Sequence, residues 1–366
     1  MRGDVREIDR LSARQKRAMV FLCLLSPMVR QLSGTPVRAA GAASWLCPAA
    51  ALLPALLYTA LLGACLRGRR SGEGLADLLA RAAGKAVGGA ISAVSGLWCV
   101  FYGGFLLRSA ADRLTSSVYE YGGDTFFIII MLAAALIAAY GYVRSLGRLA
   151  EALVPMMLLV LALILLSAMT EVSPAYLTPV SVLDAGPVAL GALPLFDLLT
   201  MQADFAFLDG YIVPEERETA GALRWTALLI VCMLLLQTAI VGGLSAGVVQ
   251  ALQHPFFVMV RSVSAFSGVD GFESAAVAVW VVTDLLFLAS LLTVASEIFR
   301  GLFGGEKRGV FVLPAAAGAA AVAAALSGDA FAVRRLSEAV LPAVNGGLKL
   351  VVLPAALGIG KLRKRL

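Results

Sequence analysis

The sequence predicts an all-α protein that crosses a membrane about ten times. Three observations support this fold class: 60% of the 366 residues are hydrophobic, the mean hydropathy is +0.88, and the apolar residues form long runs. A helix of about 20 residues crosses the hydrocarbon core of a bilayer, which is about 30 Å thick. A water-soluble domain of this length has too small an interior for so much apolar surface.

The apolar runs define ten predicted spans, which together form a single membrane domain over residues 1–366. The spans occupy residues 17–37, 43–66, 88–112, 124–143, 149–169, 186–212, 222–246, 272–299, 309–327 and 336–360. The first run lacks the small-residue cleavage site of a signal peptide, so we expect it to remain as span one. The connection 247–271 contains Phe256 and Phe257, and we expect a short helix on the membrane surface there.

The positions of lysine and arginine predict the orientation of the spans. Of the 30 basic residues, 22 are assigned to the side of the two chain ends and every second connection, and six to the opposite side. The remaining two, Arg30 and Lys349, fall within spans. The basic side of a membrane protein faces the cytoplasm, so we expect both termini there, which requires an even number of crossings. The net charge of +6 therefore reflects topology, and no nucleic-acid partner is expected.

The sequence contains no pattern that indicates catalysis or a metal site. The five cysteines are scattered through apolar runs without metal or redox spacing, and His254 is the only histidine. We expect the cysteines to be small buried residues. Accordingly, no catalytic residue, metal or cofactor is predicted.

Arg30 is a charged residue near the middle of span one, in the segment Ser26 to Pro36. An arginine at this depth costs a few kcal/mol unless it is paired or hydrated. Pro27 and Pro36 remove helix hydrogen bonds nearby and Gly34 is a weak helix former, so we expect span one to be interrupted. Two interpretations of Arg30 remain open: it binds a ligand, or it reaches the outer surface or pairs with an aspartate.

Span six repeats this pattern. Gly186, Pro187, Gly191 and Pro194 precede a polar stripe that consists of Asp197, Thr200, Gln202, Asp204 and Asp209. Two interrupted helices, one at the start of each group of five spans, are typical of an inverted five-plus-five repeat with a binding site near the membrane midplane. The alternative interpretation of the aspartates is that they pair with basic residues or lie at the span ends.

Spans three and eight add polar and aromatic candidates. Trp98 and Tyr102 are four residues apart on span three, and Trp280 and Asp284 have the same spacing on span eight, so each pair shares one helix face. We expect a small solute to bind between spans one, three, six and eight. The predicted ligand-binding residues are Arg30, Gln31, Tyr102, Thr200, Gln202 and Asp204, and Asp209 and Asp284 are candidates for ion or proton coupling.

Several short motifs appear in an order that resembles a known family. They are Trp45-Leu46, Arg108, Gly141 with Arg148-Leu149, Leu177-Thr178-Pro179-Val180, Pro214-Glu215, His254-Pro255, Arg261-Ser262, Gly271-Phe272-Glu273-Ser274 and Val279-Trp280-Val281-Val282. In order, spacing and total length the chain resembles the spore germination permeases, the B subunits of nutrient germinant receptors, which are relatives of amino-acid/polyamine/organocation transporters. The segment around span eight is the most specific part of this resemblance.

The resemblance implies a transporter-like protein of the spore inner membrane that senses a small germinant. It also implies an A subunit and a lipoprotein C subunit as partners, together with membrane lipid. The chain departs from the family at two points: span one has Ser26 to Gln31 where a glycine-rich break is common, and span six offers Asp204 or Asp209 where a glutamate is usual.

Two other functional classes remain open. An ion-coupled transporter of amino acids or other small solutes would use the same fold, with Asp204, Asp209 or Asp284 carrying a proton. A membrane enzyme would need a reactive cluster such as histidines and carboxylates at metal spacing, which a chain with one histidine does not offer.

Overall fold

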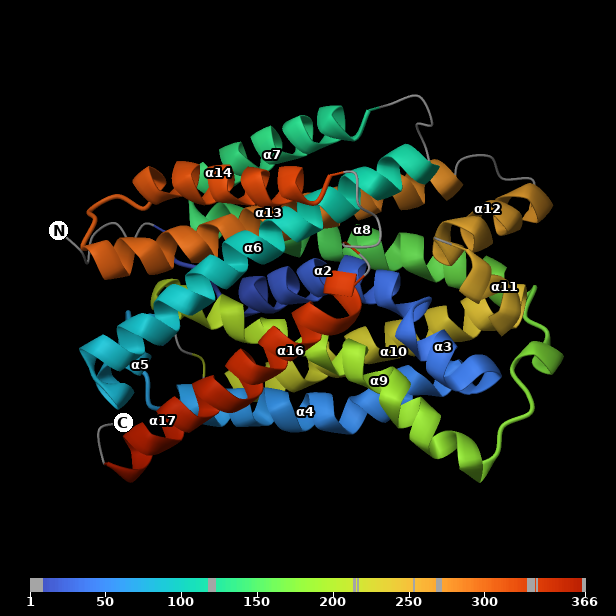
Figure 1. Cartoon of the computed structure of the whole chain (residues 1–366), viewed down its shortest axis with the longest axis horizontal. Helices are drawn as coiled ribbons and strands as arrows, with labels where there is room; N and C mark the ends of the chain where they lie inside the picture. The colour runs from blue at the N-terminus through green and yellow to red at the C-terminus, as the bar shows by residue number, and fades with distance from the viewer. Residues whose placement is uncertain are drawn as a thin grey trace.

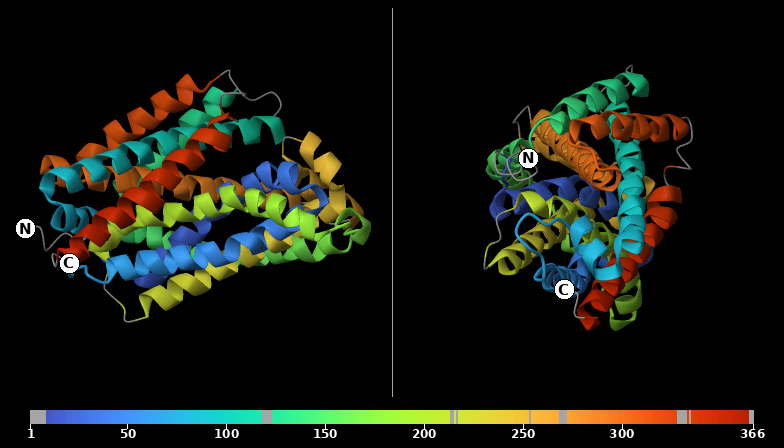
Figure 2. Two further views of the ribbon diagram at one scale, coloured as in Figure 1. Left: turned by 60° about the horizontal axis from the view of Figure 1, so that its bottom comes forward. Right: turned by 90° about the vertical axis from the view of Figure 1, so that its left-hand side faces the viewer.

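A computed structural model describes residues 9–117, 123–212, 215, 217–252, 254–267, 272–327, 333 and 335–363. Of these residues, Leu11 and Ile212 form an isolated β-bridge, and the ordered elements are helices. The long helices run along the long axis of the molecule and pack side by side in a bundle (Figures 1 and 2). Pro214 and Gly271 of the family motifs lie outside the described residues.

The first half of the chain contains two long helices joined by an irregular segment, followed by three more long helices. The elements are α2 (Ala13–Leu32), α3 (Thr35–Ala40), the 3-10 helix η1 (Gly41–Leu46), α4 (Cys47–Leu66), α5 (Leu75–Ala83), α6 (Lys85–Ser117), α7 (Asp124–Tyr140) and α8 (Val143–Met169). Span one is interrupted at Ser33 and Gly34, after Arg30, and α3 then begins with Pro36 in its first turn. Pro27 does not interrupt the α-helix, which continues to Leu32, and the interruption begins at Ser33, three residues after Arg30.

The second half begins with another interrupted helix. Its elements are η2 (Pro174–Tyr176), η3 (Val182–Asp184), α9 (Ala185–Thr200), the 3-10 helix η4 (Met201–Tyr211), α10 (Glu218–Leu244), α11 (Ala246–Ala251), α12 (Pro255–Ser267), α13 (Phe272–Phe303) and α14 (Gly309–Ala325). The last span changes between π- and α-helix: η5 (Leu336–Val340), α16 (Leu341–Asn345), η6 (Gly346–Val352) and α17 (Leu353–Leu362). The expected helix in the connection 247–271 corresponds to α11 and α12.

Seven helical stretches of the described residues are long and apolar enough to cross a membrane. They are 13–66, 85–115, 143–169, 182–211, 218–244, 277–303 and 336–362. The first of these stretches is 54 residues long and contains predicted spans one and two, while α7 and α14 are shorter apolar helices. The protein is therefore an all-α polytopic membrane protein with interrupted helices one and six, as predicted, and the total of ten crossings stays a prediction.

Glycines allow the closest helix contacts in the bundle. A Cβ added at Gly104 of α6 would lie 2.5 Å from the Ala319 carbonyl oxygen and 2.5 Å from the Val322 Cβ on α14. Small residues at such positions let membrane helices approach closely, and dispersion contacts then stabilise the pair. The contact between α6 and α14 therefore depends on the absence of a side chain at Gly104.

We predict that Gly104→Ala lowers the stability of the bundle by about 1 to 3 kcal/mol, because the added methyl group overpacks the contact. The expected measurement is a lower melting temperature for the detergent-solubilised protein. Gly243→Ala is the matched control, since a Cβ there meets nothing within 4 Å. Equal melting temperatures for the two variants would contradict the packing described here.

Candidate functional site

The polar stripe of span six lies where the helix changes type. The α-helix α9 ends at Thr200, and the chain continues for 11 residues as the 3-10 helix η4, whose residues are all buried. Runs of 3-10 helix longer than three or four residues are uncommon, and they often mark a functional hinge. The Thr200 carbonyl at this junction accepts a hydrogen bond from the Tyr58 hydroxyl of α4 at 3.2 Å. The junction thus places Thr200, Gln202 and Asp204 in the centre of the bundle.

Asp204 forms a buried ion pair with Lys349 of η6. Lys349 Nζ donates to Asp204 Oδ2 at 2.6 Å, and the two side chains are 0% and 2% exposed. In a low-dielectric interior each charge requires the other, because an isolated buried charge is strongly destabilising. In this structure Asp204 is therefore paired with a basic residue, which is the alternative interpretation given above for the aspartates of span six.

A hydrogen-bonded chain lies beside this ion pair. Trp98 Nε1 donates to Asn345 Oδ1 at 2.8 Å, and Asn345 Nδ2 donates to Asp197 Oδ2 at 3.0 Å. The second carboxylate oxygen, Asp197 Oδ1, is buried and has no hydrogen-bond partner. A buried acceptor without a partner is costly and rare in native structures, so Asp197 is a candidate for binding a ligand.

Arg30 lies at the other interrupted helix and also has atoms without hydrogen-bond partners. Its Nε and Nη1 atoms are buried without a hydrogen bond, and its guanidinium lies 4.9 Å from the centre of the Phe105 ring. The hydroxyl of Tyr102, a fully buried residue, lies beside the Arg30 guanidinium but forms no well-aligned hydrogen bond. Arg30 and Asp197 are both near enough to Tyr102 to act on it electrostatically. Three polar groups from spans one, three and six are thus gathered in one region.

Asp284 is held by residues of two other helices. Ser26 Oγ of α2 donates to Asp284 Oδ1 at 2.6 Å, and Arg113 of α6 donates to Asp284 Oδ2 and to the Ser26 hydroxyl. The side chains of Arg113 and Asp284 are 7% and 4% exposed. This cluster joins spans one, three and eight, and it neutralises a carboxylate that the sequence suggested for ion or proton coupling.

Asp209 is paired as well, at the end of the bundle that is predicted to face the cytoplasm. Lys16 Nζ lies 2.5 Å from Asp209 Oδ1, and Arg69 Nη1 lies 2.5 Å from Asp209 Oδ2. Arg69 also contacts Glu218 at 2.6 Å. Burial alone would lower the pKa of Arg69, but the carboxylates of Asp209 and Glu218 outweigh it and raise the pKa. The cluster ties the ends of α2, η4 and α10 together.

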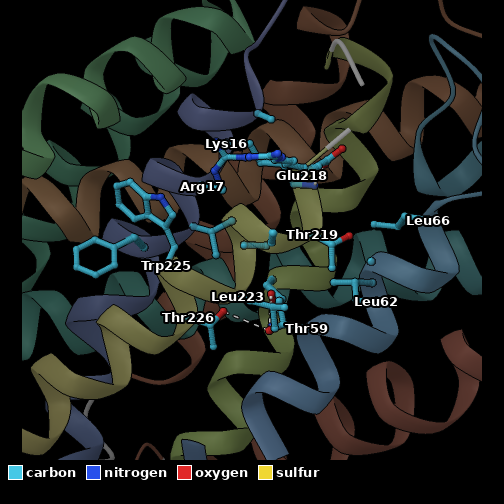
Figure 3. A pocket seen from close by; sticks show the side chains of 18 of the residues that line it. Lys16, Arg17, Thr59, Leu62, Leu66, Glu218, Thr219, Leu223, Trp225 and Thr226 are labelled. Atoms are coloured by element: carbon cyan, nitrogen blue, oxygen red, sulfur yellow. Dashed lines mark hydrogen bonds and ion pairs between the residues drawn. The ribbon is translucent and has the colours of Figure 1, made fainter. Parts of the chain in front are cut away.

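A cavity of about 560 Å³ lies next to this cluster, between α2, α4 and α10 (Figure 3). Its polar wall is formed by Thr59, Gln202 and Thr226, where Gln202 Nε2 donates to Thr59 Oγ1 at 3.0 Å and the two threonine hydroxyls are 3.2 Å apart. The predicted ligand residue Gln202 therefore faces a space between spans one, two and seven. The cavities beside Arg30 and beside Asp284, each about 20 Å³, have room for about one water molecule.

His254 lies near Arg30, in the connection before α12. It lines the small cavity beside Arg30 together with Arg113 and Trp280. Burial, with the nearby charges of Arg113 and Arg30, lowers the pKa of His254 to about 4. His254 is therefore neutral near pH 7, and the positive charge around this cavity comes from the arginines.

The sequence interpretation brought together some of these residues and missed others. Tyr102 and Asp204 are buried in the core, Arg30 is partly buried, and Gln31 is buried next to Arg30. Asp197 belongs to the predicted polar stripe but not to the predicted ligand-binding residues, and the sequence interpretation assigns no role to Asn345 or Lys349. The spacing of Asn345 and Lys349 could have identified them, because two polar residues four positions apart in an apolar span share a helix face.

Comparison with known proteins identifies the family. Residues 10–328 match the model of the Spore_permease family, described as spore germination protein. The chain belongs to this family. Among curated proteins no sequence match was found for this family member.

Two solved structures have a similar fold. The crystal structure of MhsT in complex with L-phenylalanine has a TM-score of 0.65 at 14% identity, and the match covers 94% of this chain and 97% of MhsT. The structure of Mhp1, a nucleobase-cation-symport-1 family transporter in a closed conformation with bromovinylhydantoin bound, has a TM-score of 0.57 at 15% identity. That match covers 95% of this chain and 76% of Mhp1. This member of the spore germination protein family is therefore a transporter-like integral membrane protein.

We predict that Lys349→Met in this family member lowers the stability of the bundle by about 3 to 5 kcal/mol, because it leaves the buried Asp204 carboxylate unpaired. The expected readout is a lower melting temperature in detergent. The double variant Lys349→Met with Asp204→Leu removes both charges and should regain most of the loss. A double variant that is no more stable than the single variant would show that the two side chains do not act as a pair.

Proposed function

We propose that this protein is the solute-sensing subunit of a spore nutrient receptor and that it binds a small zwitterion such as an amino acid near the membrane midplane. The observation that carries the proposal concerns two groups of opposite charge, the Arg30 guanidinium and the Asp197 carboxylate. Each has at least one buried atom without a hydrogen-bond partner. They belong to the two interrupted helices, and Tyr102 lies near both.

The chemistry of these groups fits the two ends of an amino acid. A guanidinium donates charge-assisted hydrogen bonds to a carboxylate, and the Tyr102 hydroxyl offers a further donor. The open oxygen of Asp197 would accept from an ammonium group, while its other oxygen is already held by Asn345. The structure of MhsT contains L-phenylalanine, which supports an amino acid as the ligand class, and the similarity between the two proteins extends to the fold alone.

The ion pairs of the other carboxylates favour sensing over ion-coupled transport. Asp204, Asp209 and Asp284 are each paired with a basic side chain, so none of them offers a free site for a coupling cation or proton. A sensor needs only a solute that binds one arrangement of the helices more tightly than another. The interrupted helices, where the backbone has alternatives to a regular α-helix, are the segments suited to such a change.

The family and the distribution of basic residues support a proposal for the cellular setting. We propose that the protein lies in the spore inner membrane with both termini in the cytoplasm, and that it signals to an A subunit and a lipoprotein C subunit. No catalytic role is assigned. The second candidate function is an ion-coupled transporter of amino acids or other small solutes, which the similarity to Mhp1, a symport family transporter, keeps open.

The proposal predicts a reduced sensitivity to germinant for Arg30→Gln and Asp197→Asn. The loss of a hydrogen bond to a charged group costs about 1.5 to 3 kcal/mol, so each variant should need about 10 to 150 times more germinant for the same response. The measurement is the germination rate against amino-acid concentration, in spores whose own copy of this protein is deleted and replaced by each variant.

The control variant is Arg38→Gln, which removes a partly exposed ion pair with Glu338 and should leave the response unchanged. Immunoblots must show equal amounts of all variants. Normal concentration dependence for both Arg30→Gln and Asp197→Asn would contradict the proposed site. Uptake of a labelled amino acid into proteoliposomes that stops when the ion gradient is collapsed would instead support the transporter.

A further inference from the structure

The cavity between α2, α4 and α10 has an apolar body and a basic mouth, and the proposed function does not use it. Its apolar walls are formed by side chains from three helices. They include Phe21, Leu24, Leu62, Leu66, Trp225 and Leu229. Figure 3 shows Leu62, Leu66 and Trp225 around this space, with Lys16, Arg17 and Glu218 together on one side of it. Its volume of about 560 Å³ falls within the range of small-molecule sites, about 300 to 1,000 Å³.

The mouth of the cavity is lined by basic residues at the ends of the helices. Lys16 and Arg69 are held by Asp209 and Glu218. Arg17 differs from them: its Nε and Nη1 atoms are buried without a hydrogen-bond partner, and Nη1 lies 3.5 Å from Glu215, whose side chain is 44% exposed.

Arg67 and Arg217 also line the cavity, and both are exposed. Arg17 therefore keeps donors for an anion, and two further arginines lie around the same opening.

Gly221 provides the space in which the Arg17 guanidinium lies. A Cβ at Gly221 would be 2.7 Å from Arg17 Nη1 and 2.8 Å from Arg17 Cζ. These distances are too short for a real side chain, so any larger residue at position 221 would displace the guanidinium. The backbone of α10 therefore forms a shaped cradle for this arginine.

We propose that the cavity is a binding site for an amphiphile with an anionic phosphate or carboxylate head, and that the lipid bilayer supplies it. The head would accept hydrogen bonds from Arg17, with Arg67 and Arg217 adding charge attraction, and the apolar part would lie against Phe21, Leu62 and Trp225. The cavity lies at the ends of helical stretches that satisfy the length and hydropathy of membrane spans. Lipid head groups are found at this depth, and basic residues there attract anionic lipids.

The experiment uses the fluorescence of Trp225, which lines the cavity. The full-length protein is reconstituted in phosphatidylcholine bilayers that contain increasing amounts of brominated phosphatidylglycerol or brominated phosphatidylcholine, since bromine quenches tryptophan on contact. The signal of Trp225 is obtained as the difference between the wild-type protein and Trp225→Phe. We expect half-maximal quenching at a several-fold lower mole fraction of the anionic lipid than of the zwitterionic lipid.

Two variants and a control test the role of Arg17. Arg17→Gln and Gly221→Ala should each reduce the preference for the anionic lipid, the first by removing the charge and the second by displacing it. Arg14→Gln should leave the preference unchanged, because Arg14 lies on the same helix with a side chain that is 72% exposed. Size-exclusion profiles of all variants verify that they are folded. Equal quenching by the two lipids, or a preference that survives Arg17→Gln, would overturn the proposal.

A further arm distinguishes the source of the anion. A water-soluble bromoalkyl phosphate is titrated into the protein in bilayers of unbrominated phosphatidylcholine. Quenching that saturates and depends on Arg17, without a preference for the anionic lipid, would support the anion site and overturn the bilayer as its source. A preference for the brominated anionic lipid, with no saturable quenching by the soluble compound, supports the proposal in full.

Discussion

The low dielectric constant of a membrane interior determines the arrangement of this protein, because charges buried there require partners. Three clusters satisfy that requirement. The pair Lys349–Asp204 joins the last span to span six, the cluster of Arg113 with Asp284 joins span three to span eight, and the cluster around Asp209 joins the ends of spans one, two and six. These contacts link elements far apart in the sequence, so they fix which helices lie side by side in the bundle as well as neutralising charge.

The proposed function rests on Arg30 and Asp197, two charged residues whose hydrogen bonds are incomplete. Both lie on helices that depart from regular α-helix, α2 before the break at Ser33 and α9 before the change at Thr200. Both keep buried polar atoms without hydrogen bonds, and Tyr102 lies near both. A structure that pairs its other central carboxylates but leaves these two groups incomplete is suited to a ligand that carries both charges. Binding would then complete the hydrogen bonds and favour one arrangement of the interrupted helices.

The fold class and the family could be predicted from the sequence, because long apolar runs and proline or glycine within them are local properties. The partners of the charged residues could not be predicted, since they depend on which helix faces meet. From the sequence, Lys349 is only a basic residue within a span, whereas in the structure its ammonium donates a hydrogen bond to Asp204. Similarly, the position of the cavity between α2, α4 and α10 could not be predicted, because it depends on how the faces of these helices meet.

The central claim is that Arg30 and Asp197 bind opposite ends of one zwitterion. The most direct measurement is the affinity of the purified protein for an activating amino acid, for its amide, which lacks the carboxylate, and for its deamino analogue, which lacks the ammonium. The account predicts that the wild-type protein binds both analogues at least about tenfold more weakly, that Arg30→Gln no longer discriminates against the amide, and that Asp197→Asn no longer discriminates against the deamino analogue. Discrimination that is unchanged in both variants would contradict the account.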